Sequence, residues 1–247
     1  MSDALAPYFS VITVVRNAVG TIGDCIKSVE NQSFKDYEYI VIDGLSDDGT
    51  SEVISNHMRA IDTYVREKDT GIYDAMNKAI SLCRGKYIGI INADDAYFED
   101  TLKNVQKVIT EFPDSQIVYG GVQILSGEGG SLLVDHSKLD QVMIAHPSCF
   151  VSAEVYKRFG IFDSKHKIAA DYDFMLRARN QGVIFQNSGL LLAKYRPGGA
   201  SAKLRLTSIR EMISIQAHHL GWSRAYRNYR LARYVGATFV KPKNRKI

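Results

Sequence analysis

The sequence predicts an α/β fold in which helices cover both faces of a mostly parallel central sheet. Two observations carry this prediction. Short segments of strand length alternate with segments whose apolar residues recur every three or four positions, the spacing of a helix buried on one side. The strand segments are almost entirely apolar, as is typical of parallel strands that are covered on both faces.

The first half of the chain supplies the clearest elements. Strands are expected at Phe9–Val15, Tyr37–Asp43, Ile61–Arg66 and Tyr87–Ile91. Helices are expected at Gly20–Gln32, Thr50–Met58, Gly71–Leu82 and Asp100–Phe112. Pro113 then stops the last of these helices.

The second half is less regular. A β segment at Ile117–Leu125 runs into a glycine-rich loop, and another short strand is expected after His146. Paired strands are expected over Val183–Tyr195, around Gly189. Helices are expected at Ala153–Phe159, Asp171–Gln181, Leu204–Leu220 (amphipathic) and Ser223–Val235 (basic).

Composition excludes several classes of protein. The 247 residues are 45% hydrophobic and 23% charged, an ordinary globular balance that excludes disordered and fibrous chains. The three cysteines, Cys25, Cys83 and Cys149, are odd in number and widely spaced, so we expect core residues in a reducing compartment rather than disulfides or a zinc site. No apolar run approaches the roughly 20 residues of a membrane span, and the N-terminus does not resemble a secretory signal.

Charge is unevenly distributed along the chain. Residues 203–247 carry eleven Lys and Arg against one acid, whereas the rest of the chain is acidic. Arg224, Arg227, Arg230 and Arg233 are interleaved with tyrosines. This pattern suits a helix lying on anionic lipid; a solvated terminal helix or a nucleic-acid-binding segment is the alternative.

Polar residues follow the apolar runs at the carboxyl ends of the expected strands, where open α/β sheets bind ligands. They include Asp43 and the tetrad Asn92-Ala93-Asp94-Asp95. No glycine-rich dinucleotide or P-loop motif follows a strand. Carboxylates there suit a divalent cation that bridges to a diphosphate. A turn or a helix cap is the simpler alternative for the tetrad.

Other polar residues have two interpretations. Asp43 could accept hydrogen bonds from a nucleobase or a ribose, and Asp74 with Asn77 forms either a solvated helix face or a ligand-facing first turn. Asp171, at the start of its helix, is either an N-terminal cap or a general base. His146 is a possible site residue.

Five strings in order resemble a known family. They are FSVITVVRNAVGTIGDCIKSVENQSFKDYEYIVIDGLSDDGT, EKDTGIYDAMNKAI, GKYIGIINADDAYF, HPSCFV and AADYDFMLR. Together they resemble family 2 glycosyltransferases of the GT-A fold, in particular bacterial enzymes that build O-antigen, capsule and exopolysaccharide. The likeness covers roughly residues 8–200, and five ordered motifs are more specific than any one alone.

The resemblance implies a Rossmann-like GT-A domain over residues 1–202, with a nucleotide-binding half (8–120) and an acceptor half (121–202), followed by the basic helical extension 203–247. It also implies a UDP-sugar donor and Mn²⁺ or Mg²⁺, held by Asp94 with Asp95 as neighbour or substitute. Asp171 matches the catalytic base, with Asp173 as a rival. The residues that match donor contacts are Thr13, Val15, Asn17, Asp43, Asp74, Asn77, Asn92 and Ala93. Those on the acceptor side are His146, Tyr172 and Asp173.

One position departs from the family pattern, because Asn92 stands where the first acid of the DxD motif is expected. An amide can bond a ribose hydroxyl but brings no charge to a metal.

From this resemblance we expect an inverting, metal-dependent transferase that moves a hexose from a UDP-sugar to a lipid-diphosphate-linked saccharide. It would act in the cytoplasm, held peripherally on the inner face of the membrane by residues 203–247, without nucleic acid. The alternatives are a nucleotide-binding relative without transfer activity and a membrane- or nucleic-acid-binding module.

Overall fold

A computed structural model describes residues 6–126, 129–199, 202 and 204–229. The central sheet has the strand order β3-β2-β1-β4-β8-β6-β9-β5, with β7 paired to β6. Its long ladders, β1 with β2 and β6 with β9, are parallel. The mostly parallel sheet expected from the sequence is therefore confirmed.

The first half folds as a repeated strand–helix pattern. Its elements are β1 (Phe9–Val15), α1 (Ile22–Glu30), β2 (Tyr37–Asp43), α2 (Thr50–Ser55), the short 3₁₀ helix η1 (Met58–Ala60), β3 (Thr63–Arg66), α3 (Ile72–Leu82), β4 (Tyr87–Ile90), β5 (Ala96–Tyr97) and α4 (Thr101–Glu111). All seven residues of β1 are buried, because strands pair with it on both edges and helices cover both of its faces.

The second half completes the same sheet. Its elements are β6 (Ile117–Ile124), β7 (Ser131–Leu132), η2 (His136–Lys138), η3 (His146–Ser148), β8 (Cys149–Ser152), α5 (Ala153–Phe159), α6 (Ala170–Asn180), β9 (Phe185–Tyr195) and α8 (Arg205–Leu220). The boundary expected after residue 120 falls inside β6, and β8 is inserted between β4 and β6, antiparallel to both.

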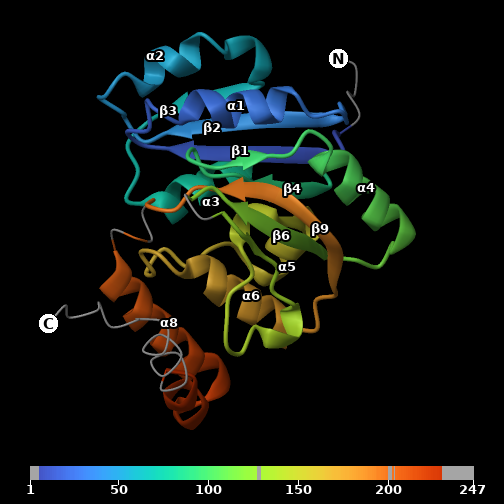
Figure 1. The fold of residues 1–247 in the computed structure, drawn as a ribbon, viewed down its shortest axis with the longest axis vertical. Helices are drawn as coiled ribbons and strands as arrows, with labels where there is room; N and C mark the ends of the chain where they lie inside the picture. The colour runs from blue at the N-terminus through green and yellow to red at the C-terminus, as the bar shows by residue number, and fades with distance from the viewer. Residues whose placement is uncertain (1–5, 127–128, 200–201, 203, 230–247) are drawn as a thin grey trace, which may run out of the picture.

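Two separate core clusters lie on the two faces of the sheet. Alternate residues of β1 divide between them, with Phe9 and Val11 in one cluster and Ile12 and Val14 in the other. Helices α1 and α4 contribute to the first cluster, and α3, α5 and α6 to the second. Helices therefore cover both faces, as the apolar patterns predict (Figure 1).

The segment Val183–Tyr195 differs from expectation. It forms one long strand, β9, rather than two paired strands. Between the pairs Tyr119↔Asn187 and Gly121↔Leu191, β6 advances two residues while β9 advances four. Gly189, with a φ of 70°, lies in this bulge. A left-handed glycine here accommodates extra residues and does not reverse the chain.

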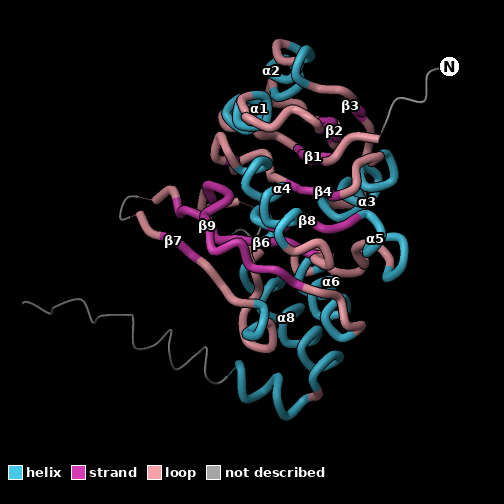
Figure 2. Tube along the Cα trace, turned by 90° about the vertical axis from the view of Figure 1, so that its right-hand side faces the viewer, coloured by secondary structure: helices cyan, strands magenta, loops and turns pink. Residues whose placement is uncertain are grey.

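The C-terminal segment packs against α6, in the second half of the chain. In both views α8 lies at the bottom of the molecule, next to α6 (Figure 1, Figure 2). Residues 222–229 are also helical, and the rest of the expected helix Ser223–Val235 lies outside the described residues. Within the described part of the chain, no helix is both long enough and apolar enough to cross a membrane.

Candidate active site

A cavity of about 890 Å³ opens at the carboxyl ends of β1 and β4. It brings together residues that are far apart in the sequence. Expected site residues that line it are Val15, Asn17, Asn92, Ala93, Asp94, His146 and Asp171. Others do not appear on its walls, namely Thr13, Asp43, Asp74, Asn77, Asp95, Tyr172 and Asp173.

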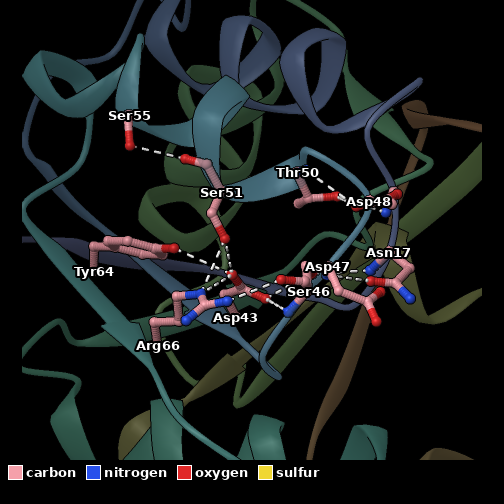
Figure 3. A network of polar contacts seen from close by, with 11 residues as sticks. Asn17, Asp43, Ser46, Asp47, Asp48, Thr50, Ser51, Ser55, Tyr64 and Arg66 are labelled. Atoms are coloured by element: carbon pink, nitrogen blue, oxygen red, sulfur yellow. Dashed lines mark hydrogen bonds and ion pairs between the residues drawn. The ribbon is translucent and has the colours of Figure 1, made fainter.

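The loop after β1 is held in place by a network centred on Asp43 (Figure 3). Asp43 is fully buried and accepts hydrogen bonds from the Ser46 amide (2.8 Å) and the Ser51 hydroxyl (2.7 Å). Ser46 in turn accepts a 2.9 Å bond from the Asn17 amide. Asn17 has a φ of 54°, a left-handed conformation that asparagine tolerates better than most residues. Asp43 thus supports Asn17 from behind the cavity wall.

Electrostatics agree with this supporting role. Burial alone raises the pKa of Asp43, but hydrogen bonds from Ser46 and Ser51 outweigh it and hold the pKa below its ordinary value. Arg66 adds an ion pair at 3.4 Å. The carboxylate is therefore charged and surrounded by donors from the protein itself.

Thr13 also lies behind the wall. Its hydroxyl is buried and bonds the Tyr39 hydroxyl at 2.9 Å and the Cys25 sulfur at 3.6 Å. Val15, two residues further along the same strand face, does line the cavity. The two residues lie on the same face of β1, and only Val15 is close enough to the end of the strand to reach the cavity.

The turn after β4 directs two neighbouring carboxylates differently. Asp94 lines the cavity, whereas Asp95 is buried and accepts hydrogen bonds from the Asn92 amide group (3.0 Å) and the backbone N–H of Arg196 (2.9 Å). Burial, reinforced by the charge of Asp94, raises the pKa of Asp95 to about 7. Asp95 therefore joins this turn to the end of β9, and Asp94 is the one of the two carboxylates that lines the cavity.

Gly199, in the segment that follows β9, also lies close to the side chain of Asp94. A Cβ atom at position 199 would come within 2.5 Å of Oδ2 of Asp94. A side chain at position 199 would therefore require the carboxylate of Asp94 to shift.

Asp171 begins α6 with its carboxylate in the cavity wall. Its Oδ1 accepts a 2.9 Å hydrogen bond from the Tyr73 hydroxyl and another of 2.9 Å from the backbone of Tyr172. Both of these hydrogen bonds fall on Oδ1, and no hydrogen bond from another described residue reaches Oδ2. His146 lines the same cavity, and burial lowers its pKa, so its imidazole is neutral near pH 7.

Asp74 and Asn77 have structural partners. Asp74 accepts a 2.8 Å hydrogen bond from the Thr70 amide at the start of α3 and forms an ion pair with Lys78. Asn77 exchanges two hydrogen bonds with the backbone of Phe162, at 2.9 and 3.1 Å. These residues anchor α3 at its start and to the segment before α6.

Tyr172 and Asp173 face α8 instead of the cavity. The Tyr172 hydroxyl donates to the Leu139 carbonyl (2.7 Å) and accepts from Gln216 (3.0 Å). Asp173 pairs with His219 at 2.8 Å. The first turn of α6 therefore presents Asp171 to the cavity and the next two residues to the C-terminal helix.

Two cavity residues, Tyr73 and Arg196, are not predicted as site residues from the sequence. Arg196 follows β9, which runs parallel to β6 and ends at the same edge as β4. The rule that singles out polar residues after strands would have found it, had the segment been expected as one strand. Tyr73 precedes Asp74 in the same helical turn.

Comparison with known proteins identifies the family. The model of glycosyl transferase family 2 matches residues 10–182. A PGL/p-HBAD biosynthesis glycosyltransferase of Mycobacterium bovis (strain BCG / Pasteur 1173P2) is 29% identical over 202 residues, 78% of each chain. Chondroitin synthase of Escherichia coli is 27% identical over 187 residues, which cover 71% of this chain and 27% of that protein.

Solved structures share the fold. S. aureus TarS 1-349 in complex with UDP-GlcNAc superposes with a TM-score of 0.70 at 18% identity, covering 94% of this chain and 76% of that chain. The mannosyltransferase PcManGT from Pyrobaculum calidifontis, in complex with GDP-Man and Mn²⁺, gives 0.69 at 16% identity, covering 97% and 77%. The architecture is the GT-A fold. Because the family model spans well over half of the chain, including β1, the Asn92–Asp95 turn and Asp171, this protein belongs to glycosyl transferase family 2.

Proposed function

We propose that the protein transfers a hexose from a UDP-sugar, with inversion, to a hydroxyl of a lipid-diphosphate-linked saccharide in the synthesis of a bacterial surface polysaccharide. The observation that carries this proposal is that one cavity contains both Asp94, at the end of β4, and Asp171, at the start of α6. Similarity to structures that hold UDP-GlcNAc and GDP-Man supports a nucleotide-sugar donor.

The nucleotide binds at the β1 end of the cavity. Val15 and Asn17 lie there, and the Asp43 network holds their loop rigid. Arg16 and Arg196 also line the cavity and provide cationic groups for a diphosphate.

Asp171 acts as the base. The acceptor hydroxyl gives its proton to Oδ2 of Asp171 while its oxygen bonds to the anomeric carbon. The bond from that carbon to UDP breaks on the opposite face, and UDP leaves with the electron pair. Because the displacement is a single step, no covalent sugar intermediate forms.

The residues fit a metal that is held largely by the substrate. Among the described residues there is no cluster of three or more metal-ligating side chains. Mg²⁺ and Mn²⁺ are commonly held by one or two carboxylates together with substrate phosphates, and Asp94 provides one carboxylate in the cavity. A cation bound by Asp94 would offset the negative charge that grows on the leaving diphosphate.

The C-terminal helices form the surface proposed to meet the membrane. Leu206 and Trp222 are each 73% exposed, and Tyr226 is 61% exposed, with Arg205 and Arg210 nearby in the chain. Apolar and basic side chains exposed together suit an anionic bilayer surface, where each basic residue contributes about 1 kcal/mol. Sedimentation with anionic but not neutral vesicles, reversed by salt, is the expected result.

The test of function is nucleotide release from a panel of UDP-, GDP- and dTDP-sugars, with Mn²⁺, Mg²⁺ or EDTA, in the presence of a synthetic lipid-diphosphate acceptor. We expect metal-dependent release from a UDP-sugar with formation of an inverted glycoside. Asp171→Asn should lower turnover about 10²–10⁴-fold. The matched control is Asp173→Asn in the same helical turn, since Asp173 faces α8. Full turnover by Asp171→Asn would overturn the mechanism.

A further inference from the structure

The two ends of the cavity differ in chemistry. At the β1 and β4 end its lining includes Arg16, Asn17, Asp69 and Asp94. Along the sheet, β8 and β6 follow β4, and the lining there is largely apolar, with His146 and Tyr195 as the polar exceptions. The apolar residues are Val122, Ile124, Leu132, Met143 and Ile168.

The apolar end is built by a strand pair and continues outward. Val122 of β6 lies opposite Leu132 of β7 in the antiparallel ladder. Val122 is 1% exposed, but Leu132 is 41% exposed, although it is a large apolar side chain. The neighbouring Leu133, which is 47% exposed, does not line the cavity and lies against Gly121 instead. Leu132 is thus an apolar side chain kept accessible inside the site.

The position of Asp171 indicates which of the two substrates contacts the apolar end of the cavity. The polar end takes the nucleotide, so the acceptor must reach Asp171 through the remaining part of the cavity, beside β6 and β7. Hydroxyl groups buried against Ile124 or Leu132 would lose water without gaining a hydrogen bond, which is unfavourable. An apolar group in the same place would be stabilised by burial.

We propose that the acceptor carries an apolar group that contacts this end of the cavity while its hydroxyl reaches Asp171, and that Leu132 helps to select it. The group is either the methyl of a deoxy or O-methyl sugar within the lipid-diphosphate-linked saccharide, or an alkyl or aryl aglycone one sugar away, which would take the place of the lipid diphosphate. This inference rests on the proposed function and narrows its acceptor class.

The test compares binding of acceptors to the enzyme with UDP and Mn²⁺, by calorimetry or ligand-observed NMR. One arm pairs a methyl glycoside with its octyl and phenyl counterparts. The other pairs a hexoside with its 6-deoxy analogue. In at least one arm, we expect the more apolar acceptor to bind at least tenfold more tightly than its polar counterpart. Where transfer occurs, kcat/KM should show the same preference. The arm that responds identifies the source of the apolar group.

Leu132→Asn should reduce that preference at least fivefold. Leu133→Asn is the matched control, because it places the same change on the next residue, outside the cavity, and should leave the preference intact. Equal binding in both arms, or equal effects of the two variants, would overturn the inference. UDP binding with transfer to polar acceptors alone would then still support the proposed function, whereas absence of UDP-sugar binding would remove the proposed function itself.

Discussion

The hydroxyl of Tyr73 in α3 donates a 2.9 Å hydrogen bond to Oδ1 of Asp171 in α6, across 98 residues of sequence. Tyr73 is 5% exposed and lines the cavity, and burial together with the Asp171 charge raises its pKa well above the ordinary value. It is therefore a neutral donor at any working pH. The bond fixes the orientation of the carboxylate, and under the proposed mechanism Oδ2 is then the oxygen that receives the acceptor proton.

Tyr73→Phe removes this hydrogen bond and keeps the ring. We expect kcat to fall roughly 5- to 30-fold, because the lost hydrogen bond raises the activation free energy by about 1–2 kcal/mol, while KM for the donor stays within twofold. Steady-state kinetics with both substrates varied will measure the two effects. A larger rise in donor KM than fall in kcat would place Tyr73 in donor binding.

Glu211 of α8 holds the segment that leads into α6. Its carboxylate accepts hydrogen bonds from the backbone N–H groups of Lys167, Ile168 and Ala169, at 2.7, 3.0 and 3.1 Å. Glu211→Ala should lower the free energy of unfolding by about 1–3 kcal/mol and lower kcat, because the turn that carries Asp171 loses its anchor. Urea denaturation and kinetics will measure both effects. Glu211→Gln, which keeps an acceptor oxygen, should recover part of each loss, and failure to do so would indicate that charge alone matters.

Stability should depend on the protonation of His146. Burial lowers its pKa in the folded protein below the unfolded value of about 6.5, so the unfolded chain binds the additional proton first. The stabilisation is present above pH 6.5 and is lost as pH falls toward the folded pKa. Urea denaturation between pH 7.5 and 5 should show this decline, at most about 1.4 kcal/mol per pH unit. His146→Gln should flatten that part of the curve, and an unchanged slope would contradict the assignment.

Asp94 and Asp95 should differ in their effect on metal dependence. Asp94→Asn removes the carboxylate in the cavity, so the Mn²⁺ concentration for half-maximal activity should rise tenfold or more. Asp95→Asn should change it less than threefold, because Asp95 accepts from Asn92 and Arg196 behind the wall. Activity titrated with Mn²⁺ separates the two variants, and the reverse order would make Asp95 the ligand.

Asn77→Ala should destabilise the fold without weakening nucleotide binding. Its two hydrogen bonds with the Phe162 backbone would be lost, at a cost of about 1–3 kcal/mol. The UDP dissociation constant, measured by calorimetry below the unfolding temperature, should change less than twofold. A tenfold loss of UDP affinity would indicate that Asn77 contacts the donor after all.

Apolar periodicity was sufficient to predict most of the sheet and the helices on it, because positions that face the core are occupied by apolar residues at the spacing of a strand or a helix. It could not predict which of two adjacent carboxylates enters the cavity, since Asp94 and Asp95 differ only in the geometry of a turn. The sequence also does not show how close a strand residue lies to the carboxyl end of the sheet. This position is what puts Val15 on the cavity wall and Thr13 behind it. Glu211 gives no local signal, because its partners lie more than forty residues earlier.

The position of β8 has a mechanical consequence. This strand comes late in the chain yet hydrogen-bonds to β4 on one side and β6 on the other. A rigid-body hinge between the first half of the chain, which carries β4, and the second, which carries β6, would have to break one of those ladders. Adjustment to substrates is therefore expected in the loops and side chains at the cavity rim rather than in the sheet.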